Sequence, residues 1–225
     1  MAEPTEIEHF DGLLSRRHSC RAFLPDAIPD AVIGQIFTTA QKVPSWCNAQ
    51  PWQVIVTRGA ATDAFRAAMI AAAENAPHRS DIPFPERYDG IYKARRSACG
   101  WALYDTVGVA RGDRAGSARE MRRNFMLFGA PHVAIITAPR DLGTYGVLDC
   151  GAFVTAFTLA AEALGVASIP QAALAGYCDV VRAHFAIPHD RVIVCGISFG
   201  RRDAAHAANG FRTGRAPSGQ VVEWR

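Results

Sequence analysis

The chain has 225 residues, of which 49% are hydrophobic and 20% charged, and its formal net charge is +3. This composition is typical of a folded globular protein. It argues against disorder and against nucleic-acid binding, which usually requires a dominant basic face. We find no internal repeat and no low-complexity linker, so we predict one domain over residues 1–225.

The N-terminal sequence and the cysteines bear on the compartment. The first residues, MAEPTEIEHF, lack the basic and apolar regions of a secretory signal, and no apolar run reaches the roughly 18 residues of a membrane span. The cysteines show neither metal-binding spacing nor a disulfide framework: Cys20, Cys47, Cys99, Cys150, Cys178 and Cys195. We therefore expect a cytoplasmic protein with reduced thiols, no metal and no membrane partner.

The first half of the chain is predicted to be mostly helical. The hydrophobic pattern predicts helices at 6–16, 29–41 and 62–75, with a buried strand at 52–57 between the last two. The middle of the chain, 77–128, mixes a proline-containing loop with helical segments at 92–106 and 117–128.

The second half is predicted to supply most of the strands, at 132–138, 166–170, 191–199 and a last short one, VVEW, at 221–224. The segment 150–165 is almost entirely apolar, which indicates a central buried helix, and a further helix is predicted at 179–185. Few strands among many helices favour an α+β sandwich of one sheet flanked by helices. The extension 201–225 has little hydrophobic content of its own, and such a tail often packs on a partner subunit.

One motif suggests a serine hydrolase. GISFG at 196–200 matches G-x-S-x-G, but the following segment is a poor helix, and only Asp203 and His206 lie close downstream as partners for Ser198. The hydrolase is therefore the less favoured hypothesis. Dinucleotide and P-loop glycine motifs do not occur. A chain so poor in chemically active side chains indicates that a cofactor does the chemistry.

Two polar stretches lie near the start of the chain. SRRHSCRAF at 15–23 holds three arginines and a serine, and Arg17 and Arg21 would face one side if the preceding helix continued. A solvated charge cluster and a fixed anion site both fit this pattern. PSWCNAQPW at 44–52 places polar side chains on a loop between prolines, and its tryptophans favour packing on a ring or on a neighbouring chain. An ordinary rigid turn is the alternative.

Two further stretches lie in the second half. IPQAALAG at 169–176 has small side chains that would let the backbone approach a ligand, although tight packing under the central helix explains them as well. NGFRTGRAP at 209–217 carries Arg212 and Arg215 on a glycine-rich loop. This loop either aims both guanidiniums at a ligand or carries unstructured charge.

Taken in this order, the stretches resemble the nitroreductase family of FMN-dependent NAD(P)H oxidoreductases. The resemblance rests on R-R-H-S-x-R, P-S-x-x-N-x-Q-P-W, the proline-containing loop after the central helix and R-x-x-R-x-P, with FGAP at 128–131 in addition. It spans nearly the whole chain. Each motif is weak alone, and the four in register make the combination specific.

The resemblance implies a central mixed or antiparallel sheet flanked by helices, in an intertwined homodimer that exchanges its C-terminal tails and binds FMN at the subunit interface. NADH or NADPH would reduce FMN in a ping-pong mechanism, and a nitroaromatic or quinone-like acceptor would then take the electrons. A nitro group would pass through nitroso to hydroxylamine. The segment 77–128 would form a lid, in which Tyr88, Tyr92, Trp101 and Tyr104 either stack on the acceptor or, more often for such residues, pack in the core.

The resemblance also implies the cofactor-binding residues: Arg17, His18, Ser19, Arg21, Pro44, Ser45, Trp46, Asn48, Pro170, Gln171, Ala172, Ala173, Arg212 and Arg215. Arg17, Ser19 and the two C-terminal arginines would hold the phosphate, and Arg21 would lie near the N1–C2=O edge of the flavin. The loop at 44–48 would reach the flavin from the other subunit, with Trp46 narrowing the substrate slot. Residues 170–173 would lie against the ring system.

One departure from the family and two alternative functions stay open at this point. Several family members carry an acidic residue in the stretch that here reads Gln171-Ala172-Ala173, so the contact to flavin N5 must come from the backbone, with the N–H of Ala172 expected, or from Gln171. No side chain is expected to be catalytic, because FMN carries the chemistry. Relatives with another acceptor (reductive dehalogenases, ene-type reductases, flavin-cleaving enzymes) and a flavin-binding module without turnover fit the same motifs.

Overall fold

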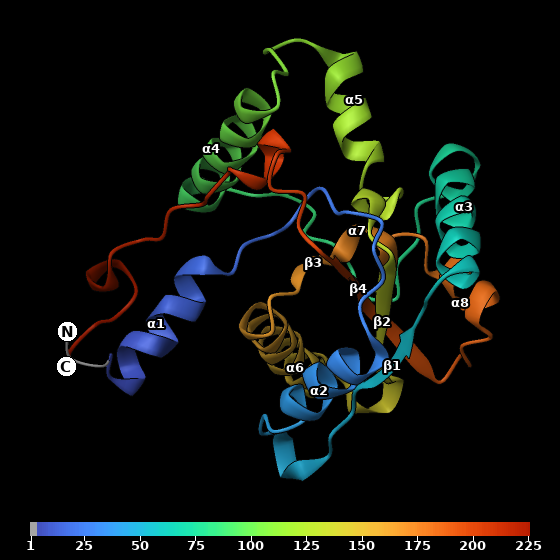
Figure 1. Ribbon diagram of the computed structural model, residues 1–225, viewed down its shortest axis with the longest axis horizontal. Coiled ribbons are helices and arrows are strands. Elements are labelled where there is room, and N and C mark those ends of the chain that lie inside the picture. Colours follow the sequence, from blue (N-terminus) through green and yellow to red (C-terminus); the bar gives the residue numbers. More distant parts are fainter. Residues whose placement is uncertain (1–3) are drawn as a thin grey trace.

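A four-stranded antiparallel sheet in the order β1-β2-β4-β3 forms the centre of the computed structural model, which describes residues 4–225 (Figure 1). The strands are β1 (Gln53–Val56), β2 (His132–Pro139), β3 (Ala167–Gln171) and β4 (Arg191–Gly200). β2 and β4 are almost fully buried, as expected for apolar runs that are covered on both faces. The predicted α+β sandwich is confirmed, and all strand pairs are antiparallel.

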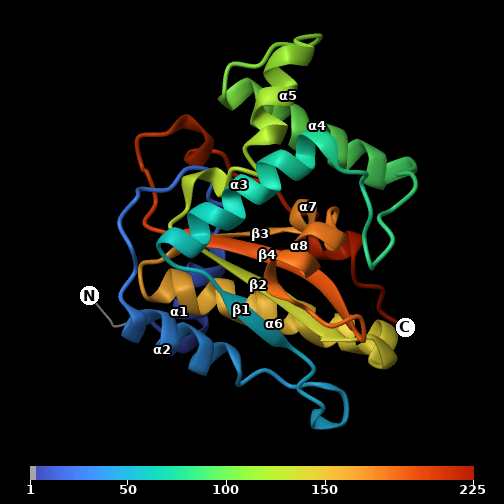
Figure 2. The same cartoon turned by 90° about the vertical axis from the view of Figure 1, so that its right-hand side faces the viewer.

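Helices cover both faces of this sheet (Figure 2). α2 (Asp30–Ala40) and α6 (Gly143–Ala163) lie on one face, and α3 (Ala60–Asn75), α7 (Ala172–Ala175) and α8 (Cys178–Phe185) lie on the other. Successive strand residues point to opposite faces, so Ala134 and Ile136 pack beneath α6 while Val133 and Ile135 pack beneath α3 and α8. The core therefore has two layers that share the sheet.

The central apolar helix α6 begins earlier than predicted, at Gly143. Phe153 and Phe157 on it are fully buried, and Phe153 stacks on Trp52 with ring centroids 5.2 Å apart. By length and composition alone, the segment Arg140–Ala163 could cross a membrane. Here it packs against the sheet and α2 as the core helix of the fold.

Two predicted elements are wrong. The helix predicted at 117–128 is α5 (Arg114–Arg122), and the chain then turns through Leu127 and Phe128 at φ values of 55° and 53°. This left-handed turn is unfavourable for L-residues, but it buries both side chains in the core. The predicted strand VVEW at 221–224 is absent from the described chain, because none of the four strands pairs with it.

The segment 77–128 extends away from the sheet. Its helix α4 (Gly90–Thr106) has no buried residue, and Tyr88 and Tyr92 are 42% and 67% exposed, so core packing is wrong for these two tyrosines.

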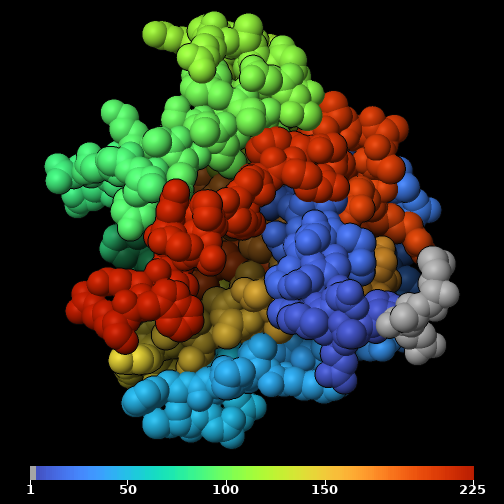
Figure 3. Space-filling view, turned by 90° about the vertical axis from the view of Figure 1, so that its left-hand side faces the viewer, coloured from blue at the N-terminus to red at the C-terminus, as the bar shows by residue number. Residues whose placement is uncertain are grey.

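The C-terminal segment crosses the face between α4 and the first helix, α1 (Glu6–Arg16), as Figure 3 shows. Thr5 and Glu8 cap α1 reciprocally, which explains why it starts at Glu6 as predicted.

Asp81 anchors the beginning of this segment to the core. Its carboxylate accepts hydrogen bonds from Arg182 at 2.6 Å, from the backbone N–H of Ile193 at 2.9 Å and from Arg140 at 2.9 Å. The Arg182 side chain is only 7% exposed. Removing the carboxylate would leave a buried guanidinium without its counter-charge.

We predict that Asp81→Ala lowers the free energy of unfolding by about 3 kcal/mol, because an uncompensated buried charge costs that much. Urea unfolding followed by circular dichroism measures the change. Asp179→Ala is the matched control, since Asp179 pairs with Arg79 at 3.4 Å on the exposed surface, and it should cost less than about 1 kcal/mol. Equal losses in the two variants would contradict the anchoring role of Asp81.

Candidate functional site

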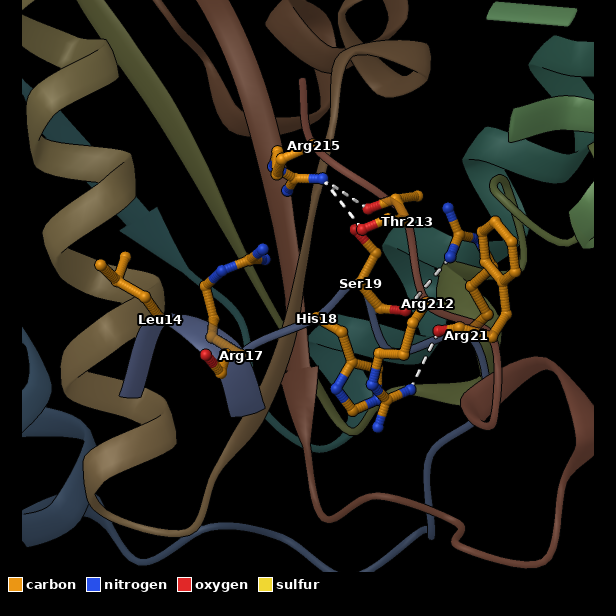
Figure 4. A pocket seen from close by; sticks show the side chains of 10 residues that line it. Leu14, Arg17, His18, Ser19, Arg21, Arg212, Thr213 and Arg215 are labelled. Atoms are coloured by element: carbon orange, nitrogen blue, oxygen red, sulfur yellow. Dashed lines mark hydrogen bonds between the residues drawn. The ribbon is translucent and has the colours of Figure 1, made fainter. Parts of the chain in front are cut away.

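A cavity of about 630 Å³ lies between the residues that follow α1 and the C-terminal segment (Figure 4). It is lined by polar and basic side chains from both ends of the chain: Arg17, His18, Ser19, Arg21, Arg212, Thr213 and Arg215, with Leu14, Ser15 and Phe211. Six of the fourteen cofactor-binding residues predicted from the sequence thus line one cavity: Arg17, His18, Ser19, Arg21, Arg212 and Arg215. No carboxylate lines it.

The N-terminal wall of the cavity is extended chain, not helix. α1 ends at Arg16, and Arg17 has the extended angles φ −60° and ψ 123°. Ser19 then bridges Ser168 on β3, and the N–H of Cys20 donates to the Ser168 carbonyl at 3.1 Å. The expected helical i, i+4 relation of Arg17 and Arg21 is therefore wrong. Extended chain places alternate residues on one side, which brings Arg17, Ser19 and Arg21 to the cavity, and His18 between them lines it as well.

Asn209 joins the two walls. Its carbonyl oxygen accepts the backbone N–H of Arg21 at 2.7 Å, and its amide donates to the carbonyls of Ala22 and Asp203, each at 2.8 Å. These contacts close a sequence separation of 188 residues. The sequence does not predict that Asn209 joins the two walls. The only signal is that the dipeptide Asn209-Gly210, within the stretch 209–217, is typical of a turn.

The arginines of the cavity carry uncompensated charge. None of the ion pairs within residues 4–225 includes Arg17, Arg21, Arg212 or Arg215. Arg212 donates to the carbonyls of Asn209 and Phe211, and Arg215 donates to the Thr213 hydroxyl, so both are held by the tail itself. Planar guanidiniums that line one cavity, from which carboxylates are absent, suit a phosphate group.

His18 is a buried side chain of the same cavity. The side chain is 8% exposed, and its Nδ1–H donates to the Arg16 carbonyl at 2.8 Å, while Nε2 has no partner in the described part of the chain. In Figure 4 the ring lies beside the Arg212 guanidinium. Burial lowers the pKa of His18, and Arg202 and Arg212 lower it further, against an opposite effect of Glu162. In the neutral ring Nε2 is an acceptor, so it would donate to a phosphate oxygen only after the ring takes up a proton, which a nearby phosphate dianion would favour.

The loop at 44–50 lies away from this cavity within one chain. Pro44, Ser45 and Trp46 line a separate cavity of about 520 Å³ beside α6. The backbone N–H of Trp46 donates to the Asp149 carboxylate at 3.1 Å, and the Trp46 ring packs at a tilt against Tyr145, with ring centroids 5.1 Å apart. Trp46 itself is 62% exposed. Asn48 sits in the same loop at a φ of 55° and is likewise exposed.

Residues 170–173 lie at the end of β3 and the start of α7. The Gln171 side chain is buried, where its oxygen accepts the Ser198 hydroxyl at 2.5 Å and its nitrogen donates to the Asn124 carbonyl at 2.9 Å. The Gln171 side chain is thus engaged in the core. Of the two contacts to flavin N5 expected from this stretch, only the one from the backbone is available, and Ala172 is exposed. Pro170 and Ala173 are half-buried beside it.

The position of Ser198 excludes the serine hydrolase. Ser198 lies within β4, is fully buried and donates its hydroxyl to Gln171. A nucleophile must be exposed at a turn between a strand and a helix, with a base within reach of its hydroxyl. The G-x-S-x-G match is therefore a buried strand sequence.

This cationic cavity lies beside β3, an edge strand of the antiparallel sheet, and its lining is that of a protein class that binds a phosphate-bearing cofactor. The profile of the Nitroreductase family matches residues 14–201, which are most of the chain. The chain therefore belongs to the nitroreductase family. The matched region includes Arg17 to Arg21 but ends before Arg212 and Arg215.

Individual relatives agree with this assignment. The chain is 37% identical over 207 residues to nitroreductase NfnB of Mycolicibacterium smegmatis, covering 91% of this chain and 87% of that protein. It is 31% identical to a 4-nitrobenzoate reductase of Pseudomonas putida, covering 92% of each. The crystal structure of the FMN-dependent nitroreductase NfnB from Mycobacterium smegmatis in complex with NADPH superposes with a TM-score of 0.94 at 33% identity, covering 98% of this chain and 100% of that chain.

We predict that the cofactor-free protein loses stability as the pH falls, in part through His18. Because burial lowers the pKa of His18, the unfolded chain takes up a proton first, and the free energy of unfolding falls below about pH 6.5, the ordinary pKa of histidine. The pKa of His132 is also lowered by burial, so part of the loss persists without His18. Urea unfolding at pH 7.5 and pH 5 should show a smaller loss for His18→Gln than for the unchanged protein. Equal losses would contradict this role of His18.

Proposed function

We propose that this protein is an FMN-dependent oxidoreductase that uses NADPH or NADH to reduce nitroaromatic compounds. The observation that carries the proposal is the cavity that arginines from both ends of the chain line, without an ion-pair partner among the described residues and without a carboxylate. The family assignment and relatives named as nitroreductases that act with FMN and NADPH support it. The 4-nitrobenzoate reductases among the relatives support a nitroaromatic acceptor.

In this proposal, residues of the cavity hold the FMN phosphate. Arg17, Ser19 and Arg215 bind the phosphate oxygens, with Arg212 and the Nε2 of His18 beside them. Arg21, whose N–H is held by Asn209, places its cation at the flavin edge, where it stabilises negative charge. The backbone of residues 170–173 lies against the ring system. FMN supplies the hydride-accepting and electron-donating chemistry when it is bound.

We further propose a homodimer, because the chain leaves apolar side chains exposed that a soluble monomer would bury. Phe10 on α1, Trp46, Leu148 on α6 and Trp224 in the tail are between 49% and 91% exposed. In the dimer the loop at 44–48 reaches the cavity of the partner subunit. The end of the tail, which carries the exposed Val222 and Trp224, packs on the partner, and the segment 77–128 forms a lid.

We predict a mass of twice that of the chain in sedimentation equilibrium, and dissociation at higher concentrations when residues 218–225 are deleted. The reason is that this deletion removes Trp224 and Val222 from the contact. A variant that shortens only the exposed side chain of Met121 on α5 serves as the control. A monomer at micromolar concentration in the unchanged protein would contradict the dimer.

We infer that the protein acts in the cytoplasm. All six cysteines are free, and Cys47 and Cys99 are exposed. Exposed thiols persist in a reducing compartment and oxidise in an oxidising one. Recovery of the protein from a periplasmic or secreted fraction would contradict this inference.

The function is tested with the purified protein. We predict a yellow protein whose flavin absorbance bleaches anaerobically on addition of NADPH or NADH and returns with 4-nitrobenzoate. Arg215→Ala should raise the Kd for FMN about tenfold or more, since it removes a charged hydrogen bond to phosphate. Arg16→Ala is the matched control, because Arg16 lies at the exposed end of α1 and does not line the cavity.

Three results would contradict parts of this proposal. A colourless protein that cannot bind added FMN would overturn the function. A yellow protein that neither reduced nucleotide bleaches would indicate a flavin-binding module without turnover. Full occupancy by FMN in Arg215→Ala would place the phosphate elsewhere.

A further inference from the structure

A second cavity of about 610 Å³ lies on the other side of the tail, between the tail and α4. Residues 211–215 form a shared wall with the first cavity. Arg95, Cys99 and Ala102 on α4 line the opposite wall, and Gln220 lies beside them. Its volume lies within the usual range of small-molecule sites, about 300–1,000 Å³.

This second cavity is also cationic. Arg95 adds its guanidinium to those of Arg212 and Arg215, and no carboxylate lines the cavity. Within residues 4–225 Arg95 forms no ion pair, and its contact with the Gln220 side-chain oxygen is long, at 3.5 Å. The guanidinium therefore has donors free for a ligand.

The charges of the two cavities exceed what one FMN can neutralise. Together the cavities hold five unpaired guanidiniums, those of Arg17, Arg21, Arg95, Arg212 and Arg215. A phosphate monoester carries about −1.5 to −2 charges at neutral pH. At least about three positive charges stay uncompensated after FMN binds, and they attract a second anion.

We propose that the cavity between α4 and the tail binds the nucleotide end of NADPH, and that Arg95 selects NADPH over NADH by pairing with the 2′-phosphate. This rests on the proposed function, in which a nicotinamide nucleotide reduces FMN. The 2′-phosphate is the only group that distinguishes the two nucleotides, so the residue that selects must recognise a dianionic phosphate. Arg95 is the cation in this cavity that the FMN cavity does not share.

The test uses the oxidised, FMN-loaded protein and isothermal titration with 2′,5′-ADP and 5′-AMP, which differ by the 2′-phosphate. Arg95→Gln should raise the Kd of 2′,5′-ADP about tenfold or more, as expected for loss of a charged hydrogen bond, and leave the Kd of 5′-AMP unchanged. Arg95→Lys should retain part of the affinity, because it keeps the charge but loses the fork of donors.

Arg96→Gln is the matched control and should change neither Kd. Arg96 neighbours Arg95 on α4, but its guanidinium lies over the Tyr88 ring at 5.2 Å and does not line the cavity. The flavin spectrum of each sample shows that FMN is bound, which separates this test from failure of the proposed function.

Two outcomes would overturn the proposal. In one, Arg95→Gln weakens the binding of 2′,5′-ADP and of 5′-AMP equally, or weakens neither. In the other, it leaves both nucleotides unchanged and raises the KM for 4-nitrobenzoate but not for nitrobenzene. The second result would assign Arg95 to the carboxylate of an acceptor instead of the coenzyme.

Discussion

The site depends on positive charge that the chain itself does not neutralise. Arginines from residues 17–21 and from the tail face one cavity without a carboxylate, and guanidiniums in this arrangement repel one another. Asn209 holds the two segments together with two hydrogen bonds, to Arg21 and Ala22, so the repulsion is tolerated. The cavity therefore suits an anion, which would neutralise part of this charge.

The sheet positions this site through its edge. Ser19 bridges Ser168 on β3, the outermost strand, and this pairing keeps the segment extended so that alternate side chains face the cavity. The buried contacts of Gln171 with Ser198 and Asn124 hold the end of the same strand. Asp81 ties the segment 77–128 to the other end of the sheet through Arg182 and Ile193. The buried core thus positions the residues that line the cavity at its edge.

Most helices and strands could be predicted from the sequence, because their residues form apolar runs that are typical of buried elements. The strands predicted at 132–138 and 191–199 agree with β2 and β4 within a residue at either end. The failures share one cause, which is that the deciding contacts lie far away in sequence. The turn at Leu127 and Phe128 forms because the core accepts both side chains. The segment VVEW has a strand composition, but no strand edge in the chain pairs with it.

By itself, the sequence determined which residues are candidates for the site: its arginines, Ser19, the loop at 44–52 and the small residues at 170–173 could be selected, because their types suit phosphate and backbone contacts. Only the tertiary structure decided how they are arranged. It replaced the expected helical pairing of Arg17 and Arg21 with extended alternation, since Ser19 bonds to β3. It also withdrew the Gln171 side chain into the core. The local sequence determines which ligands a side chain can bind. Which side chains lie together depends on packing between distant segments, such as Arg21 and Asn209, which are 188 residues apart.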